Sequence, residues 1–219
     1  MVRLIALSKP SAVTDCHTAE ELIAYAARVS NPANQNNTKT ASKLLGYLIR
    51  ENHWSPFEMV HLTMEITTTR DISRQILRHR SFSFQEFSQR YAVSESFVSR
   101  EARLQDKKNR QNSFKTDDKE LAEEWTMIQQ SVINHSRNAY QWALDNGIAK
   151  EQARAVLPEG NTETTLYMAG SLRSWIHYCQ LRMANGTQKE HMQIAQQCWN
   201  IIKGHFPSIS GALENGEEG

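Results

Sequence analysis

The sequence contains little cysteine, glycine or proline, and it carries almost no net charge. Its 219 residues include three cysteines, nine glycines and five prolines, and 25 basic against 24 acidic side chains leave a net charge of +1. The cysteines (Cys16, Cys179 and Cys198) are odd in number and lack metal-type spacing, which argues against a disulfide framework and indicates free thiols in a reducing compartment. The near-neutral charge argues against bulk binding of nucleic acid, for which a strongly basic chain is usual.

Long hydrophobic runs are also missing. No apolar run approaches the ~18 residues that a membrane-spanning helix needs. The first ten residues, MVRLIALSKP, lack the apolar core and the cleavage site of a signal peptide. With 39% hydrophobic and 22% charged residues, the chain has the composition of a soluble globular protein, and its length suits one domain with a sizeable core. We therefore expect a soluble, cytoplasmic protein without a membrane span or a metal site.

Hydrophobic periodicity predicts an α+β fold, in which several long helices pack on a small antiparallel sheet within a single domain over residues 1–219. Strands are expected at 2–7, 58–67 and 91–98. Helices are expected at 18–30, 38–51, 70–80, 117–147, 166–182 and 187–202. The longest helix carries an apolar stripe made of Leu121, Trp125, Ile128, Val132, Ala139, Trp142 and Ala143. We expect an exposed excursion at about 100–116 and a frayed tail from about 208 to 219.

Residues 75–90, QILRHRSFSFQEFSQR, form the stretch with the most polar chemistry. Five arginines and only two carboxylates between Arg70 and Arg90 give this window a net charge of +3 with histidine neutral. Arginine presents a planar fork of donors that fits phosphate or carboxylate, and Ser88 with nearby backbone amides would complete a phosphate cradle. Glu86 would either accept from a sugar hydroxyl or hold an arginine in place. From charge alone, a solvated face or an ion-pair network is the favoured explanation of the stretch.

The order and spacing of these residues favour the ligand-binding interpretation. The triplet Arg78-His79-Arg80, followed by Ser88 and Arg90, resembles the signature of the flavin-dependent thymidylate synthases. Further matches occur in the family's order, namely RVS at 28–30, HWSPFE at 53–58, EQARAVLP at 151–158 and RSWIHYCQLR at 173–182. The resemblance therefore extends from about residue 20 to about residue 200. Because successive helical residues turn by about 100°, the three residues of the triplet cannot all face one ligand.

The resemblance implies an activity and a set of partners. The expected reaction is reductive methylation of dUMP to dTMP, with 5,10-methylenetetrahydrofolate as carbon donor and NADPH as reductant through FAD. The implied partners are dUMP, folate and a nicotinamide nucleotide, but neither nucleic acid nor membrane. The family assembles as a homotetramer with active sites shared between subunits.

The resemblance also implies which residues form the site. The residues expected to contact FAD are Ser30, His53, Ser55, Arg78, His79, Arg80, Glu86, Ser171, Arg173 and His177. Those expected to contact the nucleotide are Gln75, Arg78, Glu86, Phe87, Ser88, Gln89, Arg90, Arg154 and Arg182. Arg182 is the expected catalytic residue, because it aligns with the family arginine that polarises the pyrimidine; the alternative is that it only caps the end of a helix.

Two features of the sequence bear on the mechanism. Cys179 and Cys198 lie on apolar helix faces, where cysteine usually fills the core, so we expect methyl transfer without a cysteine nucleophile. Many relatives have histidine where this chain has Gly186, so a flavin contact is expected to be missing there or replaced by backbone. Two other functions remain open from the sequence: a small nucleic-acid-binding protein that uses the arginine-rich stretch, and a flavoprotein without methyl transfer.

Overall fold

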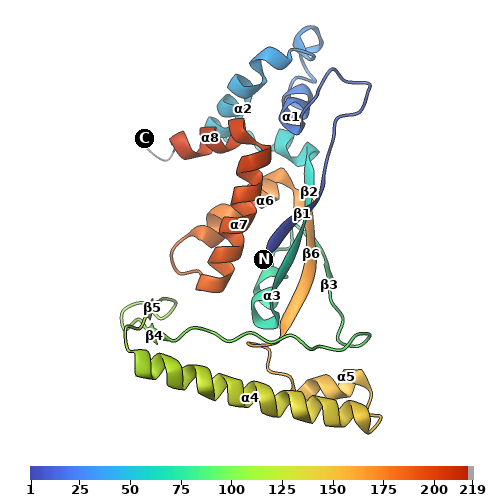
Figure 1. The fold of residues 1–219 in the computed structure, drawn as a ribbon. Coiled ribbons are helices and arrows are strands. Elements are labelled where there is room, and N and C mark those ends of the chain that lie inside the picture. The colour runs from blue at the N-terminus through green and yellow to red at the C-terminus, as the bar shows by residue number, and fades with distance from the viewer. Residues whose placement is uncertain (217–219) are drawn as a thin grey trace.

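A four-stranded antiparallel sheet forms the centre of the protein, and most of the helices pack against it (Figure 1). The computed structural model describes residues 1–216. The strand order is β1-β2-β6-β3, where the strands are β1 (Val2–Leu7), β2 (His61–Thr69), β6 (Glu163–Ser171) and β3 (Ser83–Glu86). The α+β fold expected from the sequence is therefore confirmed.

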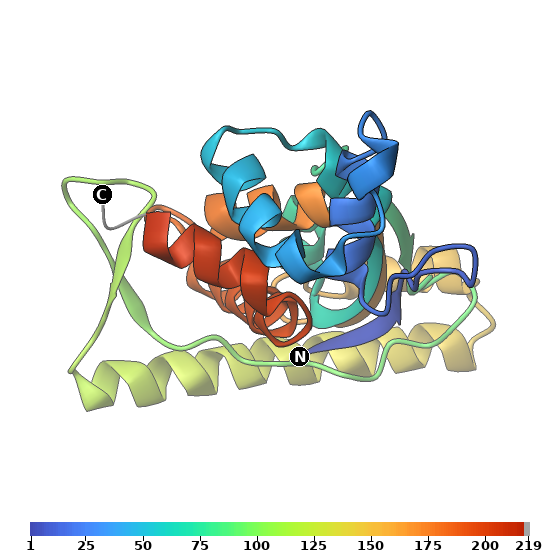
Figure 2. The ribbon, with the colours of Figure 1, turned by 90° about the horizontal axis from the view of Figure 1, so that it is seen from above.

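The remaining elements surround this sheet. The helices are α1 (Ala19–Ala27), α2 (Ala41–Arg50), α3 (Arg70–Ile76), α4 (Lys119–Asp145), α5 (Lys150–Ala153), α6 (Leu172–Met183), α7 (Lys189–His205) and α8 (Pro207–Gly216). Short 3-10 turns are η1 (Pro32–Asn34), η2 (Thr38–Thr40), η3 (Ser55–Met59) and η4 (Arg154–Val156), and a hairpin is formed by β4 (Arg103–Gln105) and β5 (Ser113–Lys115). Figures 1 and 2 both show α4 as a long arm along one side of the molecule. No helix among residues 1–216 has the length and apolar character needed to cross a bilayer.

The core lies between the sheet and the pair α6 and α7. Met64 of β2 pairs with Met168 of β6, and Ile66 pairs with Leu166, so alternate residues of both strands share the buried face. Trp175 of α6 is fully buried against this face and donates its indole N–H to the carbonyl of Leu62 at 3.2 Å. Full burial of each such side chain stabilises the fold by about 1.5–3 kcal/mol. The core therefore fixes α6 firmly against β2 and β6.

The prediction of one continuous helix over residues 166–182 is wrong. Residues up to Ser171 form strand β6, and only residues from Leu172 onward are helical. Within the strand, Thr164, Leu166 and Met168 are buried, and their neighbours in the chain are more exposed, which is the period of a strand and not of a helix. Because helices cover this face of the sheet, the segment is apolar enough to resemble a buried helix. The hydroxyl of Ser171 accepts from the amide of Ser174 at 3.3 Å and starts α6 as its N-cap.

Three other expectations need correction. Residues 91–98 form no strand and contribute only an isolated bridge between Phe97 and Thr162, and the fourth strand is instead β3. Helix α3 ends at Ile76 and not at residue 80, so the Arg-His-Arg triplet lies beyond its end. The expected frayed tail is helical up to Gly216, because Ile209 is buried and Glu20 accepts from its amide at 3.0 Å. Residues 217–219 of that expected tail lie outside the described part of the chain.

The segment at 100–116 and helix α4 form the most exposed part of the molecule. The predicted excursion contains the hairpin β4–β5. Asp118 caps α4 by accepting from the amide of Leu121 at 3.0 Å, and Gly147, with φ +76°, follows its end. Most of the predicted apolar stripe of α4 is exposed, however, including Ile128 at 50% and Trp142 at 63%. Nothing within residues 1–216 covers this stripe.

Candidate functional site

The predicted site residues fall into three groups along β6. This strand has nine residues. Its first and last Cα atoms are therefore separated by eight steps of about 3.4 Å, or roughly 27 Å. One group lies at the Ser171 end, beside η3 and the start of α6. A central group lies between the end of α3, α6 and α7, and a third group lies at the Glu163 end, beside α5. One copy of the chain therefore does not gather all predicted residues around a single point.

The central group is the most highly organised. Arg182 Nε donates to His79 Nε2 at 2.9 Å, and the His79 ring packs edge-on against Tyr178 with 4.9 Å between ring centroids. His191 is fully buried, with its Nε2 3.1 Å from the Tyr178 hydroxyl and its Nδ1 3.3 Å from Gln75 Oε1. Arg182 and Gln75, which were predicted to bind the nucleotide, are thus both connected to one buried aromatic cluster.

Burial keeps the two histidines of this cluster neutral. Desolvation, followed by the nearby Arg182 cation, lowers the pKa of His79 from 6.5 to about 4. Burial, with the charges of Arg182 and His79, lowers the pKa of His191 to about 3. A neutral His79 is what the geometry requires, because its Nε2 must keep a lone pair to accept from Arg182. The terminal nitrogens of Arg182 make no other hydrogen bond within residues 1–216, so they are available to a ligand.

The rest of the Arg-His-Arg triplet faces solvent. Because α3 ends at Ile76, the chain turns there, and His79 points inward while Arg78 and Arg80 are exposed. Neither of these guanidinium groups has an ion-pair partner among residues 1–216. His79 contacts Arg182 and Tyr178 while its two neighbours face outward, so the three side chains point in different directions although the triplet is not helical as expected.

The group at the Glu163 end gathers around the start of α5. Arg90 Nε lies 3.2 Å from the Glu151 carboxylate, and Arg154 Nε donates to the backbone carbonyl of Glu151 at 3.3 Å. The amide of Arg90 donates to the hydroxyl of Ser88 at 3.3 Å. A cavity of about 330 Å³ beside them is lined by Arg70, Arg74, Gln89, Glu151, Arg154, Ala155, Leu157, Glu159 and Thr162. The lining thus carries three arginines against two glutamates, Glu151 and Glu159.

Of the two roles predicted for Glu86, the contacts within the chain correspond to holding an arginine in place. Its carboxylate accepts from Ser73 at 2.9 Å and from Thr164 at 3.0 Å, and it lies 3.7 Å from the guanidinium of Arg70. It therefore holds an arginine at the edge of the cavity described above. Its neighbour Phe87 is partly exposed, and the Phe87 amide donates to the carbonyl of Thr165 at 2.9 Å, in line with the β3–β6 pairing.

The group at the Ser171 end combines a cation with aromatic rings. Arg173 forms an ion pair with Glu58 of η3, and His177 packs edge-on against Trp54 with 4.9 Å between ring centroids. Burial and the charge of Arg173 lower the pKa of His177. Of the other predicted cofactor ligands, Ser30, His53 and Ser55 are exposed at this end, whereas the hydroxyl of Ser171 is engaged in capping α6.

The cysteines are packed as core residues. Cys16 is buried at the edge of the core, and Cys179 and Cys198 are fully buried between α6 and α7. Burial is the main cause that raises the pKa of all three thiols above the ordinary value. A thiol in such a place stays protonated near neutral pH and is a poor nucleophile. The prediction that Cys179 and Cys198 fill the core is confirmed.

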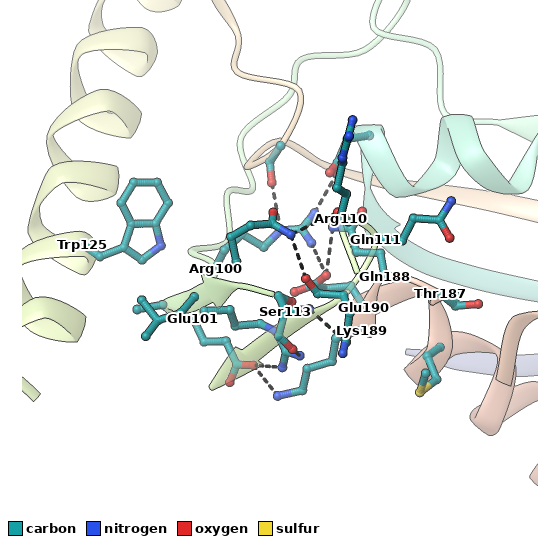
Figure 3. Close-up of a pocket in the computed structure, with 18 of the residues that line it drawn as sticks. Arg100, Glu101, Arg110, Gln111, Ser113, Trp125, Thr187, Gln188, Lys189 and Glu190 are labelled. Atoms are coloured by element: carbon teal, nitrogen blue, oxygen red, sulfur yellow. Dashed lines mark hydrogen bonds and ion pairs between the residues drawn. The ribbon is translucent and has the colours of Figure 1, made fainter. Parts of the chain in front are cut away.

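A second cavity, which we call the hairpin cavity, is lined by none of the predicted site residues. Its volume is about 850 Å³, and it is enclosed by the β4–β5 hairpin and the first turns of α4 and α7. Figure 3 shows Trp125 on one side of it and Arg110, Gln111 and Lys189 on the other. It connects to the central group through Gln188 on its wall, which accepts from Gln75 Nε2 at 2.8 Å. Nearby, Gly186 has φ +89°, a conformation that favours glycine over other residues.

Sequence reasoning missed several members of these groups. Tyr178 lies within the matched segment at 173–182, but the helix period alone gave it no role. His191 and Gln188 lie more than 110 residues from Gln75 and have no local motif. Trp54 was part of the matched HWSPFE segment but was not assigned a contact. The packing of α7 against α3 and α6 brings Tyr178, Gln188 and His191 to Gln75, whereas Trp54 meets His177 where η3 packs against α6.

Comparison with known proteins assigns the chain to a family. A family profile described as "Thymidylate synthase complementing protein" matches residues 12–208. The chain is 54% identical over 213 residues to the "Probable flavin-dependent thymidylate synthase" of Paramecium bursaria Chlorella virus 1, covering 97% of this chain and 98% of the relative. It is 53% identical over 215 residues to the "Flavin-dependent thymidylate synthase" of Synechocystis sp., covering 97% and 99%.

A solved structure agrees with these sequence matches. The UMP/dUMP methylase PolB from Streptomyces cacaoi, bound with 5-Br UMP, superimposes with a TM-score of 0.84 at 26% identity and covers 98% of this chain and 93% of that chain. The match of sequence to these relatives and of fold to the Streptomyces enzyme thus covers nearly the whole chain. It includes the triplet at 78–80, Ser88, Arg154 and Arg182. The protein belongs to the family of flavin-dependent thymidylate synthases.

Proposed function

We propose that the protein methylates dUMP reductively to dTMP, with 5,10-methylenetetrahydrofolate as carbon donor, NADPH as reductant and FAD as cofactor. Family membership supports this reaction, and one geometric observation carries it. Arg182 is held by the neutral ring of His79 at 2.9 Å, with its remaining donors free. It is a fixed cation whose place in the matched segment is that of the family arginine beside the pyrimidine.

The phosphate of dUMP is assigned to the group at the Glu163 end. Arg90 pairs with the Glu151 carboxylate, and Arg154 donates to the Glu151 backbone carbonyl. A nucleotide phosphate would replace the carboxylate as the anionic partner of Arg90 and would give Arg154 an anionic partner beside it. Ser88 and the backbone amide of Arg90 supply further polar groups beside the two cations. Gln75, in the central group, is then available to the base or the sugar.

The chain offers groups that fit a flavin dinucleotide. Arg78 and Arg80 are exposed guanidinium groups without ion pairs in the described residues, and they suit the phosphates of FAD. His177, Trp54 and Arg173 present aromatic and cationic surface at the Ser171 end, where a flavin ring would be held. When bound, the flavin supplies the hydride that NADPH delivers to it.

Arg182 would activate the pyrimidine without a covalent bond to the protein. Uracil C5 is a poor nucleophile unless electron density is pushed into the ring. A fixed cation beside the pyrimidine O2 favours loss of the N3 proton and so polarises the ring toward C5. The alternative, attack by a thiolate at C6, is disfavoured because burial raises the pKa of all three thiols.

The functional unit is proposed to be a homotetramer with shared active sites. Two observations support sharing: the predicted residues are spread along the roughly 27 Å of β6, and the apolar stripe of α4 is exposed. Light scattering should give about four times the chain mass. Changing Ile128 and Val132 together to Glu should yield smaller species, whereas Gln130→Glu on the polar side of α4 should not. A monomeric wild-type protein with full activity would contradict this assembly.

The experiment that tests the function uses the purified protein directly. The protein should be yellow and should form dTMP only when dUMP, methylenetetrahydrofolate and NADPH are all present, and omission of any one should abolish the product. UMP should be tested beside dUMP, because the similar Streptomyces enzyme is named for both. A yellow protein without dTMP formation would indicate a flavoprotein of another function. A colourless protein with salt-dependent nucleic-acid binding would refute the proposal.

A further inference from the structure

Behind Gln75 lies a chain of hydrogen bonds that runs from the wall of the hairpin cavity, beside β4–β5, to the core. Glu190 Oε2 accepts from Gln188 Nε2 at 3.0 Å, and Gln188 Oε1 accepts from Gln75 Nε2 at 2.8 Å. Gln75 Oε1 lies 3.3 Å from His191 Nδ1, and His191 Nε2 lies 3.1 Å from the Tyr178 hydroxyl. We call these five side chains the polar chain. Figure 3 labels Gln188 and Glu190, which stand at its cavity end.

The polar chain has only one direction that satisfies every member. A carboxylate only accepts, so Gln188 must turn its NH₂ group toward Glu190 and its carbonyl oxygen toward Gln75. Gln75 must then donate to Gln188 and present its own carbonyl oxygen to His191. His191 is therefore protonated on Nδ1, and its Nε2 accepts from the hydroxyl of Tyr178. In the reversed direction, the carbonyl oxygen of Gln188 would face the carboxylate of Glu190.

The residues around both ends of the polar chain stabilise this direction of its hydrogen bonds. Glu190 is held by the guanidinium of Arg100 at 2.9 Å, which also pairs with Asp71 at 2.7 Å. At the other end, His191 is fully buried and Tyr178 is 2% exposed, so water does not replace a lost partner there. The charged or titratable groups that face His191 are Arg182 and His79 of the central group, together with the Tyr178 hydroxyl of the polar chain.

We propose that Glu190 is a positioning residue that sets the direction of the polar chain and so fixes the orientation of the Gln75 amide toward the nucleotide. Within the polar chain, Gln75 Nε2 donates one of its two hydrogens to Gln188, and Gln75 Oε1 accepts one hydrogen bond from His191. One N–H and one carbonyl lone pair of the Gln75 amide therefore remain for a ligand. If the amide reversed, donor and acceptor would exchange places and would oppose the ligand's own groups. The inference concerns a residue outside the expected site and rests on the proposed function only where Gln75 contacts dUMP.

The test is the isosteric change Glu190→Gln, which lets position 190 either donate or accept. Calorimetric titration of the flavin-loaded protein with dUMP should show a Kd weakened about three- to tenfold, the size of one misplaced neutral hydrogen bond. The matched control is Glu101→Gln, because Glu101 lines the same cavity and pairs with Arg103 and Lys189 but lies outside the polar chain. This control should change the Kd less than twofold.

The same change made in a Gln75→Ala protein shows whether the effect of Glu190 on dUMP affinity depends on Gln75. In a Gln75→Ala protein, Glu190→Gln should change the Kd for dUMP less than twofold. The proposal is overturned if Glu190→Gln weakens dUMP binding equally in the wild type and in the Gln75→Ala protein, or if it weakens binding in neither. If Glu190→Gln does not fold, Tyr178→Phe removes the donor at the opposite end without adding volume, and the same dependence on Gln75 is expected.

Failure of the proposed function is distinguishable from failure of this inference. A wild-type protein that does not bind dUMP refutes the function, but the polar chain is still testable by nitrogen-15 NMR of histidine-labelled protein. The signals of His191, identified by their loss in His191→Phe, should show a single neutral form protonated on Nδ1 in the wild type. Glu190→Gln should give a mixture of the two neutral forms. A wild-type His191 protonated on Nε2, or the same single form in both proteins, overturns the proposal.

Discussion

Replacement of Arg182 by alanine separates its proposed catalytic role from a structural one. As a helix-capping cation in the last turn of α6, Arg182 would contribute about 0.3–1 kcal/mol to stability. The structure adds a second stability cost, because the change leaves His79 Nε2 without its donor, and a partly buried unsatisfied acceptor costs about 1–3 kcal/mol. Neither cost affects the rate of methyl transfer in protein that remains folded.

The catalytic role makes a much larger prediction for the rate. Loss of one preorganised donor that stabilises developing charge lowers a rate constant roughly 10²–10³-fold. The assay is single-turnover dTMP formation, with flavin absorbance to show that the cofactor is retained and thermal unfolding to measure stability. Arg50→Ala is the matched control, since Arg50 occupies the last turn of α2 and contacts, within residues 1–216, only exposed side chains, Glu51 and the ring of Tyr47. It should lose stability slightly and retain full activity.

Two results would refute this reasoning. One is an Arg182→Ala protein that keeps its flavin and transfers methyl groups within tenfold of the wild-type rate. The other concerns the cysteines: Cys16, Cys179 and Cys198 changed together to Ala or Ser should leave the chemistry intact in whatever fraction folds, because burial raises the pKa of each thiol. If that folded protein forms no dTMP while Arg182→Ala does, a thiol carries the reaction.

Three further outcomes are expected. Arg90→Ala or Arg154→Ala should weaken dUMP binding about tenfold or more in calorimetry without loss of flavin, since charged hydrogen bonds contribute about 1.5–3 kcal/mol each; unchanged affinity in both would contradict the phosphate assignment. His177→Ala should lower the flavin content or shift its absorbance spectrum, and a variant with wild-type content, spectrum and reduction rate would remove His177 from the site. The free energy of unfolding should fall as pH drops from about 6.5 toward 4. In this range His79 and His191 bind protons in the unfolded chain but stay neutral in the folded protein, where their pKa values are about 4 and about 3. The slope is at most ~1.4 kcal/mol per pH unit for each histidine, and denaturant unfolding of His191→Phe should show a shallower slope than the wild type over that range.

Local patterns in the sequence were enough to predict the elements whose signals are short-range. A short apolar run predicted β1, and the alternation of apolar and polar residues predicted β2. Thr18 and Glu21, three residues apart, form a capping box at the start of α1. The order of short motifs, from the triplet at 78–80 to the segment at 173–182, was enough to predict the family. These features are determined within a few residues of chain, where spacing alone reports which side chains share a face.

The tertiary structure decided what depends on burial and on distant partners. Residues 166–171 were predicted as helix because a strand that is covered by helices is apolar for most of its length, and only its pairing with β2 distinguishes it. Gln75 and His191 are separated by 116 residues, and their contact exists because α7 packs beside α3 and α6. The neutral state of His79 likewise follows from its burial beside Arg182, a partner 103 residues away. No local pattern encodes such contacts, since each depends on how the whole chain closes around one core.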